Sequence, residues 1–246
     1  MNSATAWTPL VGAWAEDLFL HGHDLARWIT DYVDLEESLA VGSMSQEGLA
    51  HAANLWAALG HDSEWRDHKV YRSEPAEWGP SALCATRLLD WPATVVRGLL
   101  VAEGALTLLD RLESQVESLR HVAAVLAAEQ RLHAHHWQRW VRVLGHDPAT
   151  KDDFVKVLAA GCGAASDLFG ALSTSSFTDD ALLGELHVQW VTRVRAAIAA
   201  GGVEIPEMPS RSPRKQMEEH APLAAILDGI RGVRTAHPDW NYEVVE

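Results

Sequence analysis

Two glutamate–histidine pairs with the same spacing are the residues of this sequence best suited to chemistry. The pairs are Glu47/His51 and Glu129/His133. Residues four positions apart lie on the same face of an α-helix, so each pair would present a carboxylate beside an imidazole. These groups either bind metal ions or hydrogen-bond to partners. The spacing therefore predicts a polar site wherever the two faces meet.

Apolar residues place both pairs on faces that turn toward other helices. Glu129 and His133 share a stripe with Leu119, Val122, Leu126, Trp140 and Leu144, and Glu47 and His51 share one with Ala40, Met44 and Ala58. Helices with such stripes pack against one another through them. A buried acid without a partner is costly, so the four polar side chains must find partners inside the bundle.

Acids on a third helix extend the expected site. Glu103 and Asp110 lie within residues 92–113, a stretch that is apolar around most of its circumference. We therefore expect a buried polar cluster made of Glu47, His51, Glu103, Asp110, Glu129 and His133. The first helix offers no clear acid, because its apolar face includes His21, borders Asp17 and points away from Glu16.

The elements that must position these residues are helices, because the sustained alternation typical of strands is absent. Helix-start signals stand at Asp34, Asp90 and Asp147, and Gly60 marks a helix end. The predicted helices span residues 9–30, 35–59, 92–113, 116–144, 149–170, 179–200 and 217–235, with short pieces between 63 and 89. The predicted fold class is all-α, a helical bundle with additional C-terminal helices.

We expect a single domain over residues 1–246, with a core bundle at about 8–200 and a C-terminal helical tail at 215–246. Glycines and prolines predict an extended connector between them at 201–214. These residues are Gly201, Gly202, Pro206, Pro209 and Pro213. A short basic cluster follows, made of Arg211, Arg214 and Lys215. Such a cluster is most often solvated surface, and the alternative is contact with phosphates or an acidic partner.

Composition excludes several classes of protein. The 246 residues carry 34 acids against 20 Lys and Arg, a formal charge of −14, with no basic stripe to bind nucleic acid. Two cysteines are too few for a disulfide framework and suit a reducing cytoplasm. No charge-free apolar run of about 18 residues indicates a membrane segment, and neither a nucleophile elbow nor a phosphate loop is present. We expect a cytoplasmic protein.

Ferritin-like bundles hold two iron or manganese ions with a carboxylate from each of four helices and two Glu-x-x-His pairs. Here the histidines follow the glutamates by four residues, and Ala50 and Leu132 occupy the usual histidine positions. Since this shift turns each imidazole to the other side of its glutamate, we favour a hydrogen-bonded polar core with no catalytic, cofactor-binding or metal-ligating residue. The alternative metal ligands are Glu47, Glu103, Glu129 and His133, with Asp17 or Glu16.

Four segments have spacings similar to those of one known family. They are Glu129-Gln130-Arg131-Leu132-His133 leading to Trp137 and Leu144-Gly145, the stretch from Glu16 to Trp28, Ser38-Leu39-Ala40-Val41 leading to Glu47 and Asn54, and Glu219-His220, Leu223 and Leu227 leading to Pro238 and Trp240. Through these segments nearly the whole chain resembles the PaaC-type structural subunit of the bacterial phenylacetyl-CoA epoxidase, in the PaaA/PaaC ferritin-like family. The match is weak over residues 63–90.

The resemblance implies a ferritin-like fold and a non-catalytic structural subunit of a monooxygenase complex, which forms the ring 1,2-epoxide of phenylacetyl-CoA in phenylacetate degradation. It also implies that the di-iron centre belongs to a homologous A-type catalytic partner, that this chain binds no cofactor, and that it self-associates. Departures at Glu16-Asp17, Glu47 and His51 replace Asp-Asn, Asp and Gln of the family and favour metal binding. Two alternatives remain: a di-metal carboxylate oxygenase, or a helical scaffold of an unrelated pathway.

Overall fold

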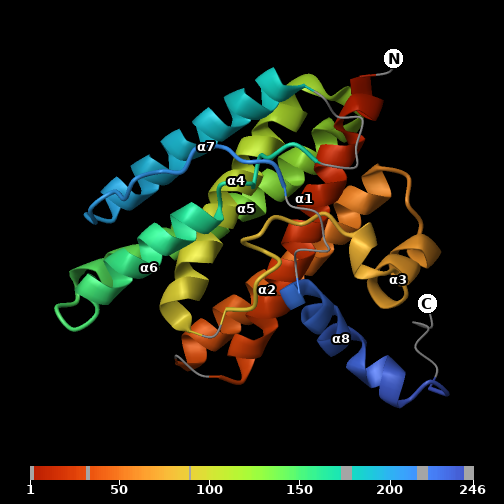
Figure 1. Ribbon diagram of the computed structural model, residues 1–246, viewed down its shortest axis with the longest axis horizontal. Coiled ribbons are helices and arrows are strands. Elements are labelled where there is room, and N and C mark those ends of the chain that lie inside the picture. Colours follow the sequence, from red (N-terminus) through yellow and green to blue (C-terminus); the bar gives the residue numbers. More distant parts are fainter. Residues whose placement is uncertain (1–2, 32–33, 89, 173–178, 215–220, 241–246) are drawn as a thin grey trace.

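The structure, a computed structural model, describes residues 3–31, 34–88, 90–172, 179–214 and 221–240. Every regular element over these ranges is helical, so the predicted all-α fold class is confirmed (Figure 1). The α-helices are α1 (Ser3–Leu25), α2 (Leu35–Ala58), α3 (Ser63–Tyr71), α4 (Trp91–Gln115), α5 (Arg120–His146), α6 (Lys151–Ala164), α7 (Asp180–Ala200) and α8 (Ala221–Ala236). Three short 3-10 turns accompany them, η1 (Ala26–Ile29), η2 (Pro75–Glu77) and η3 (Glu117–Leu119).

Side-chain caps set the starts of α2 and α4 where the sequence predicts them, whereas the predicted start at Asp147 is wrong: Asp147 follows the end of α5, and α6 begins at Lys151 without a side-chain cap. Asp34 accepts a hydrogen bond from the backbone N–H of Glu37 at 2.7 Å and starts α2. Asp90 does the same for α4 through the N–H of Ala93 at 2.8 Å. Beyond the end of α2, Gly60 has a φ of +93°, a conformation that favours glycine. Local sequence alone therefore fixes these ends.

Two helices differ most from the predicted ranges. The first begins at Ser3 instead of residue 9, runs through Pro9 and passes into η1 after Leu25. The fifth predicted helix, α6, ends at Ala164 instead of residue 170. Residues beyond it turn inward, and Asp167 and Phe169 are buried. Packing of these side chains, rather than helix propensity, decides where α6 ends.

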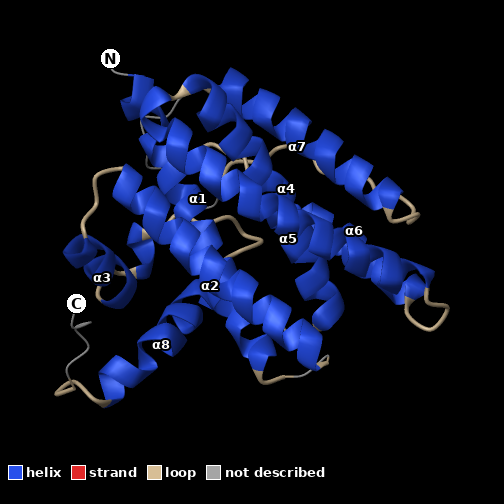
Figure 2. Ribbon diagram, turned by 180° about the vertical axis from the view of Figure 1, so that it is seen from behind, coloured by secondary structure: helices blue, strands red, loops and turns tan. Residues whose placement is uncertain are grey.

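Two helical hairpins form the ferritin-like bundle, α1 with α2 and α4 with α5, and α6 and α7 pack on the second hairpin (Figures 1 and 2). Small residues make room for tryptophans between the helices. A Cβ atom on Gly104 would lie 2.4 Å from the Trp14 ring, and one on Gly98 would lie 2.3 Å from the Trp137 ring. Large rings opposite glycines thus fill the core at high density.

Helix α4 is the central helix of the bundle. Its length of 25 residues and its apolar composition match those of a membrane span, yet 89% of its most apolar 18-residue window is buried inside the protein. The apolar surface of α4 is thus covered within the fold.

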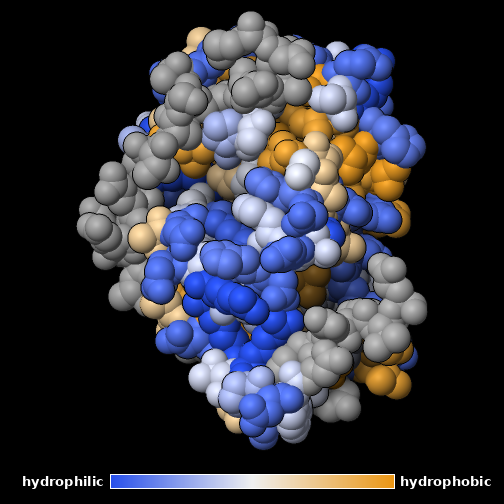
Figure 3. Space-filling view, turned by 90° about the vertical axis from the view of Figure 1, so that its right-hand side faces the viewer, coloured by the Kyte–Doolittle hydropathy of each residue, from blue (hydrophilic) through white to orange (hydrophobic). Residues whose placement is uncertain are grey.

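Helix α8 packs beside α3, and its Leu223 and Leu227 are fully buried. The face that carries α3 and α8 is mostly hydrophilic (Figure 3).

Candidate functional site

Helices α2 and α5 bring four of the expected polar residues together. His51 Nε2 lies 2.5 Å from Glu129 Oε2, and His133 Nε2 lies 2.5 Å from Glu47 Oε2. The two imidazole rings stack with centroids 6.0 Å apart and an interplanar angle of 23°. Each glutamate therefore pairs with the histidine of the facing helix, not with the one four residues away on its own helix. We name these four residues the α2–α5 cluster.

Further hydrogen bonds orient the α2–α5 cluster. The side-chain amide of Gln130 donates to His51 Nδ1 at 3.0 Å, which leaves the Nε2–H of His51 to donate to Glu129. On the other pair, Ser43 donates to Glu47 at 3.0 Å. The assembly is thus a set of directed hydrogen bonds that joins α2 to α5.

A third glutamate–histidine pair continues the row between α2 and α5. His136 Nε2 lies 2.7 Å from Glu37 Oε1, and both side chains are largely buried. Sequence reasoning missed this pair because its members are 99 residues apart and Glu37 lies in the first turn of α2. The position of His136 three residues after His133 on one helix face was the available signal.

The α2–α5 cluster lies at the edge of the bundle rather than in its middle. The side chains of His51 and His133 are 1% and 8% exposed, whereas those of Glu129 and Glu47 are 43% and 36% exposed. Burial lowers the pKa of His133, and the hydrogen bond to Glu47 opposes this shift. Both carboxylates keep water contact, so their charge is less costly than full burial would make it.

The two acids of α4 face other neighbours. Glu103 is buried and accepts a hydrogen bond from the Gln138 amide at 3.1 Å. Burial raises the pKa of Glu103, and this hydrogen bond opposes the shift. Asp110 pairs with Arg131 at 3.2 Å and also with Arg193. Neither acid joins the α2–α5 cluster. The sequence did not predict this, because α4 is apolar on most sides and its pattern does not reveal which face meets which helix.

The acids of α1 also point away from the α2–α5 cluster. Asp17 is fully buried and pairs with Arg214 at 2.7 Å, while the backbone N–H and the hydroxyl of Ser81 donate to its other oxygen. Glu16 pairs with Lys69 at 2.7 Å. Burial raises the pKa of Glu16, and Lys69 opposes the shift. Asp17 therefore binds the segment after α3 and the connector, whereas Glu16 binds α3 and, through the backbone N–H of Gly79, the segment after it.

The basic cluster of the connector is not the solvated surface that the sequence favours. Arg214 is 2% exposed and also donates to the carbonyl oxygens of Gly79 and Leu168. Arg211 pairs with Asp180 at the start of α7, and Lys215 lies outside the described residues. The guanidinium of Arg214 thus anchors the connector in the core, a role for which the local sequence gives no signal.

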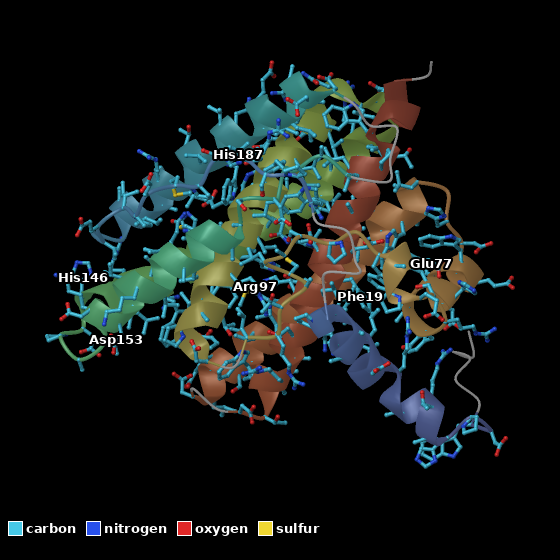
Figure 4. The ribbon with its side chains drawn as sticks, viewed as in Figure 1. Phe19, Glu77, Arg97, His146, Asp153 and His187 are labelled. Atoms are coloured by element: carbon cyan, nitrogen blue, oxygen red, sulfur yellow. The ribbon has the colours of Figure 1, made fainter. Side chains whose placement is uncertain are left out.

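Positive charge lies between α1 and α4 close to the α2–α5 cluster. Arg97, 1% exposed, pairs with Asp24 and donates to the carbonyl oxygen of Thr86 at 2.8 Å; it lies toward the middle of the molecule (Figure 4). Burial lowers the pKa of His21 well below its usual value, with further lowering by the charges of Arg97 and His133. Beside His133, α1 therefore contributes the imidazole of His21, and the Arg97 guanidinium of α4 is paired with Asp24 of α1.

This donor set does not fit a two-metal centre, which takes carboxylates from four helices. The α2–α5 cluster has two carboxylates from two helices, and each is bound to an imidazole. Over the described parts of the chain, no group of three or more His, Cys, Asp or Glu residues is arranged to hold a metal ion. The geometry is suited to joining helices.

Comparison with known proteins identifies the family. The sequence model of one family, PaaA_PaaC, described as phenylacetic acid catabolic protein, matches residues 2–241. No curated protein sequence gives a significant match. The matched range takes in every helix from α1 to α8, so the resemblance seen in separate segments extends over the whole fold. The chain belongs to the PaaA/PaaC family of phenylacetic acid catabolic proteins.

Proposed function

We propose that this chain is the non-catalytic structural subunit of a phenylacetyl-CoA epoxidase, the monooxygenase complex that forms the ring 1,2-epoxide, and that it supports a homologous di-iron A-type catalytic subunit. Family membership implies a role in phenylacetate catabolism, which leaves a scaffold of an unrelated pathway without support. We also propose that the chain is cytoplasmic, binds no cofactor, nucleic acid or membrane, and associates with the A-type subunit and with copies of itself.

The observation that carries this proposal is the separate pairing of the candidate metal ligands. Glu47, Glu129 and His133 meet in the α2–α5 cluster, whereas Glu103 and the acids of α1 have partners elsewhere in the fold. The partners are His133 for Glu47, Gln138 for Glu103, His51 for Glu129, Arg214 for Asp17 and Lys69 for Glu16. Acids paired in this way stabilise contacts between helices, and an oxygen-activating centre needs them free to converge on one point.

Metal analysis tests the absence of a metal site. The chain is purified aerobically with added iron, alone and beside its Glu129→Ala variant. We expect iron far below one atom per chain in both samples, because no cation site depends on Glu129. Near-stoichiometric iron that the Glu129→Ala variant loses would refute the proposal. It would favour the alternative, a di-metal carboxylate oxygenase with ligands among Glu47, Glu103, Glu129 and His133 and with Asp17 or Glu16.

Coexpression tests the structural role. The chain is produced with an A-type homologue, and the mixture is analysed by size-exclusion chromatography with light scattering. We expect a stable complex of both chains, with epoxidation of phenylacetyl-CoA by the A-type subunit dependent on this chain. An A-type subunit that is equally soluble and active without this chain would refute the role.

A further inference from the structure

A cavity of about 360 Å³ lies between the end of α1, the start of η1, the segment before α4 and the first turns of α8. Its volume falls within the range of about 300–1,000 Å³ that is usual for small-molecule sites. Polar residues line one side, namely His23, Asp24, Arg27 and Arg87. Ala225 and Ile226 of α8 line the other side. The cavity therefore has a charged wall and an apolar wall.

The charged wall is positive, although the whole chain has a formal charge of −14. Its one acid, Asp24, is already paired with Arg97. This pairing leaves the guanidinium groups of Arg27 and Arg87 without a carboxylate partner in the lining. Two uncompensated arginines beside one cavity attract an anion and offer the paired donors that carboxylates and phosphates accept.

Both arginines keep unused donors. Arg27 donates through Nη1 to the carbonyl oxygen of Leu88, and its Nε is buried with no hydrogen-bond partner. Arg87 is exposed and forms no hydrogen bond or ion pair with any described residue. A buried donor without a partner is unfavourable in a folded protein. An acceptor supplied by a ligand would remove that cost.

His23 adds a third polar group to the same wall. Burial lowers the pKa of His23, and the charge of Arg87 lowers it further, while Asp24 opposes the shift. A neutral imidazole donates one N–H and can hold a ligand oxygen beside the two guanidinium groups. Across the cavity, Ala225, Ile226 and Gly229 of α8 form an apolar wall against which a compact apolar group can pack.

We propose that this cavity binds a small organic oxyanion, a carboxylate or a phosphate ester with a compact apolar body. Arg27 and Arg87 hold the anionic head, and the first turns of α8 cover the apolar body. This inference is independent of the proposed structural role, because it concerns the isolated chain and involves no residue of the α2–α5 cluster.

Calorimetric titration of the full chain tests the proposal with three probes that share a phenyl ring: phenylacetate, phenyl phosphate and uncharged 2-phenylethanol. We expect at least one of the two anions to bind at one site per chain and the alcohol to bind at least about tenfold more weakly, since it lacks a charged acceptor. Tighter binding of phenyl phosphate identifies a phosphate ester as the ligand class, and tighter binding of phenylacetate identifies a carboxylate. Absence of binding by both anions at millimolar concentration would overturn the proposal.

Variants locate the site. Arg87→Gln removes an exposed charge that forms no hydrogen bond or ion pair with any described residue and should weaken anion binding about tenfold. Arg139→Gln, also exposed but on α5, is the matched control and should leave affinity unchanged. Ile226→Trp fills the cavity from α8 and should abolish binding while circular dichroism shows a folded protein. Binding that survives both Arg87→Gln and Ile226→Trp, or that Arg139→Gln weakens equally, would overturn the assignment.

Discussion

Asp167 is a buried carboxyl group whose ionisation should make the folded protein less stable. Burial raises the pKa of Asp167 from 3.8 to about 6, although the guanidinium of Arg214 and the backbone N–H of Ala82 favour the ionised form. A carboxyl group with a raised pKa binds its proton more tightly in the folded state. Its stabilising contribution is therefore present below about pH 4 and is lost as the pH rises through about 6.

The size of the effect follows from the shift in pKa. About two pKa units at about 1.36 kcal/mol each correspond to roughly 3 kcal/mol. Asp167→Asn removes this ionisation and keeps an oxygen that accepts from Ala82. We expect the variant to have a free energy of unfolding about 2–3 kcal/mol higher than the parent at pH 8, and equal to it below about pH 4.

Urea unfolding between pH 4 and pH 8, followed by circular dichroism, measures this difference. Asp153→Asn is the matched control, because Asp153 is exposed and pairs with Lys156, which lowers the pKa of that carboxyl. The control should show no change in stability with pH between 5 and 8 relative to the parent. A variant Asp167→Asn that is less stable than the parent at pH 8 would show that attraction to Arg214 outweighs burial, and the reasoning would fail.

Two further substitutions test the packing of the core. Arg214→Ala leaves the buried Asp17 carboxylate without its partner and should lower the free energy of unfolding, measured in urea, by about 3–5 kcal/mol. Adding Asp17→Asn to this variant should restore part of the lost stability, and no recovery would contradict the pairing. Gly98→Ala places a Cβ atom 2.3 Å from the Trp137 ring and should cost about 1–3 kcal/mol. In contrast, a Cβ atom on Gly184 in α7 meets no atom within 4 Å, so Gly184→Ala should raise the free energy of unfolding by about 0.5–1 kcal/mol. Equal effects of the two glycine substitutions in urea unfolding would refute this account.

The glutamate–histidine pairs connect two helices of the bundle. Each pair spans α2 and α5, and a third pair, Glu37 with His136, extends the same row. Three hydrogen-bonded pairs along one interface fix the register of two helices. The polar residues therefore specify how the two hairpins of the bundle meet.

The sequence by itself determined the helices and the faces that carry polar residues. Caps such as Asp34 and Asp90 and the terminator Gly60 act within one turn of the chain, so their effect is encoded locally. The spacing of Glu129 and His133 places both on one face of α5 for the same reason. The whole-chain resemblance to the PaaA/PaaC family was also visible, because it rests on these spacings.

Only the tertiary structure decided which polar groups meet. Asp17 pairs with Arg214, 197 residues away, and Glu103 turns to Gln138 instead of joining the α2–α5 cluster. Such contacts depend on the rotation and crossing of whole helices, which the packing of many side chains sets together. Helix periodicity shows that a residue faces the interior, but not which of several neighbouring helices it faces.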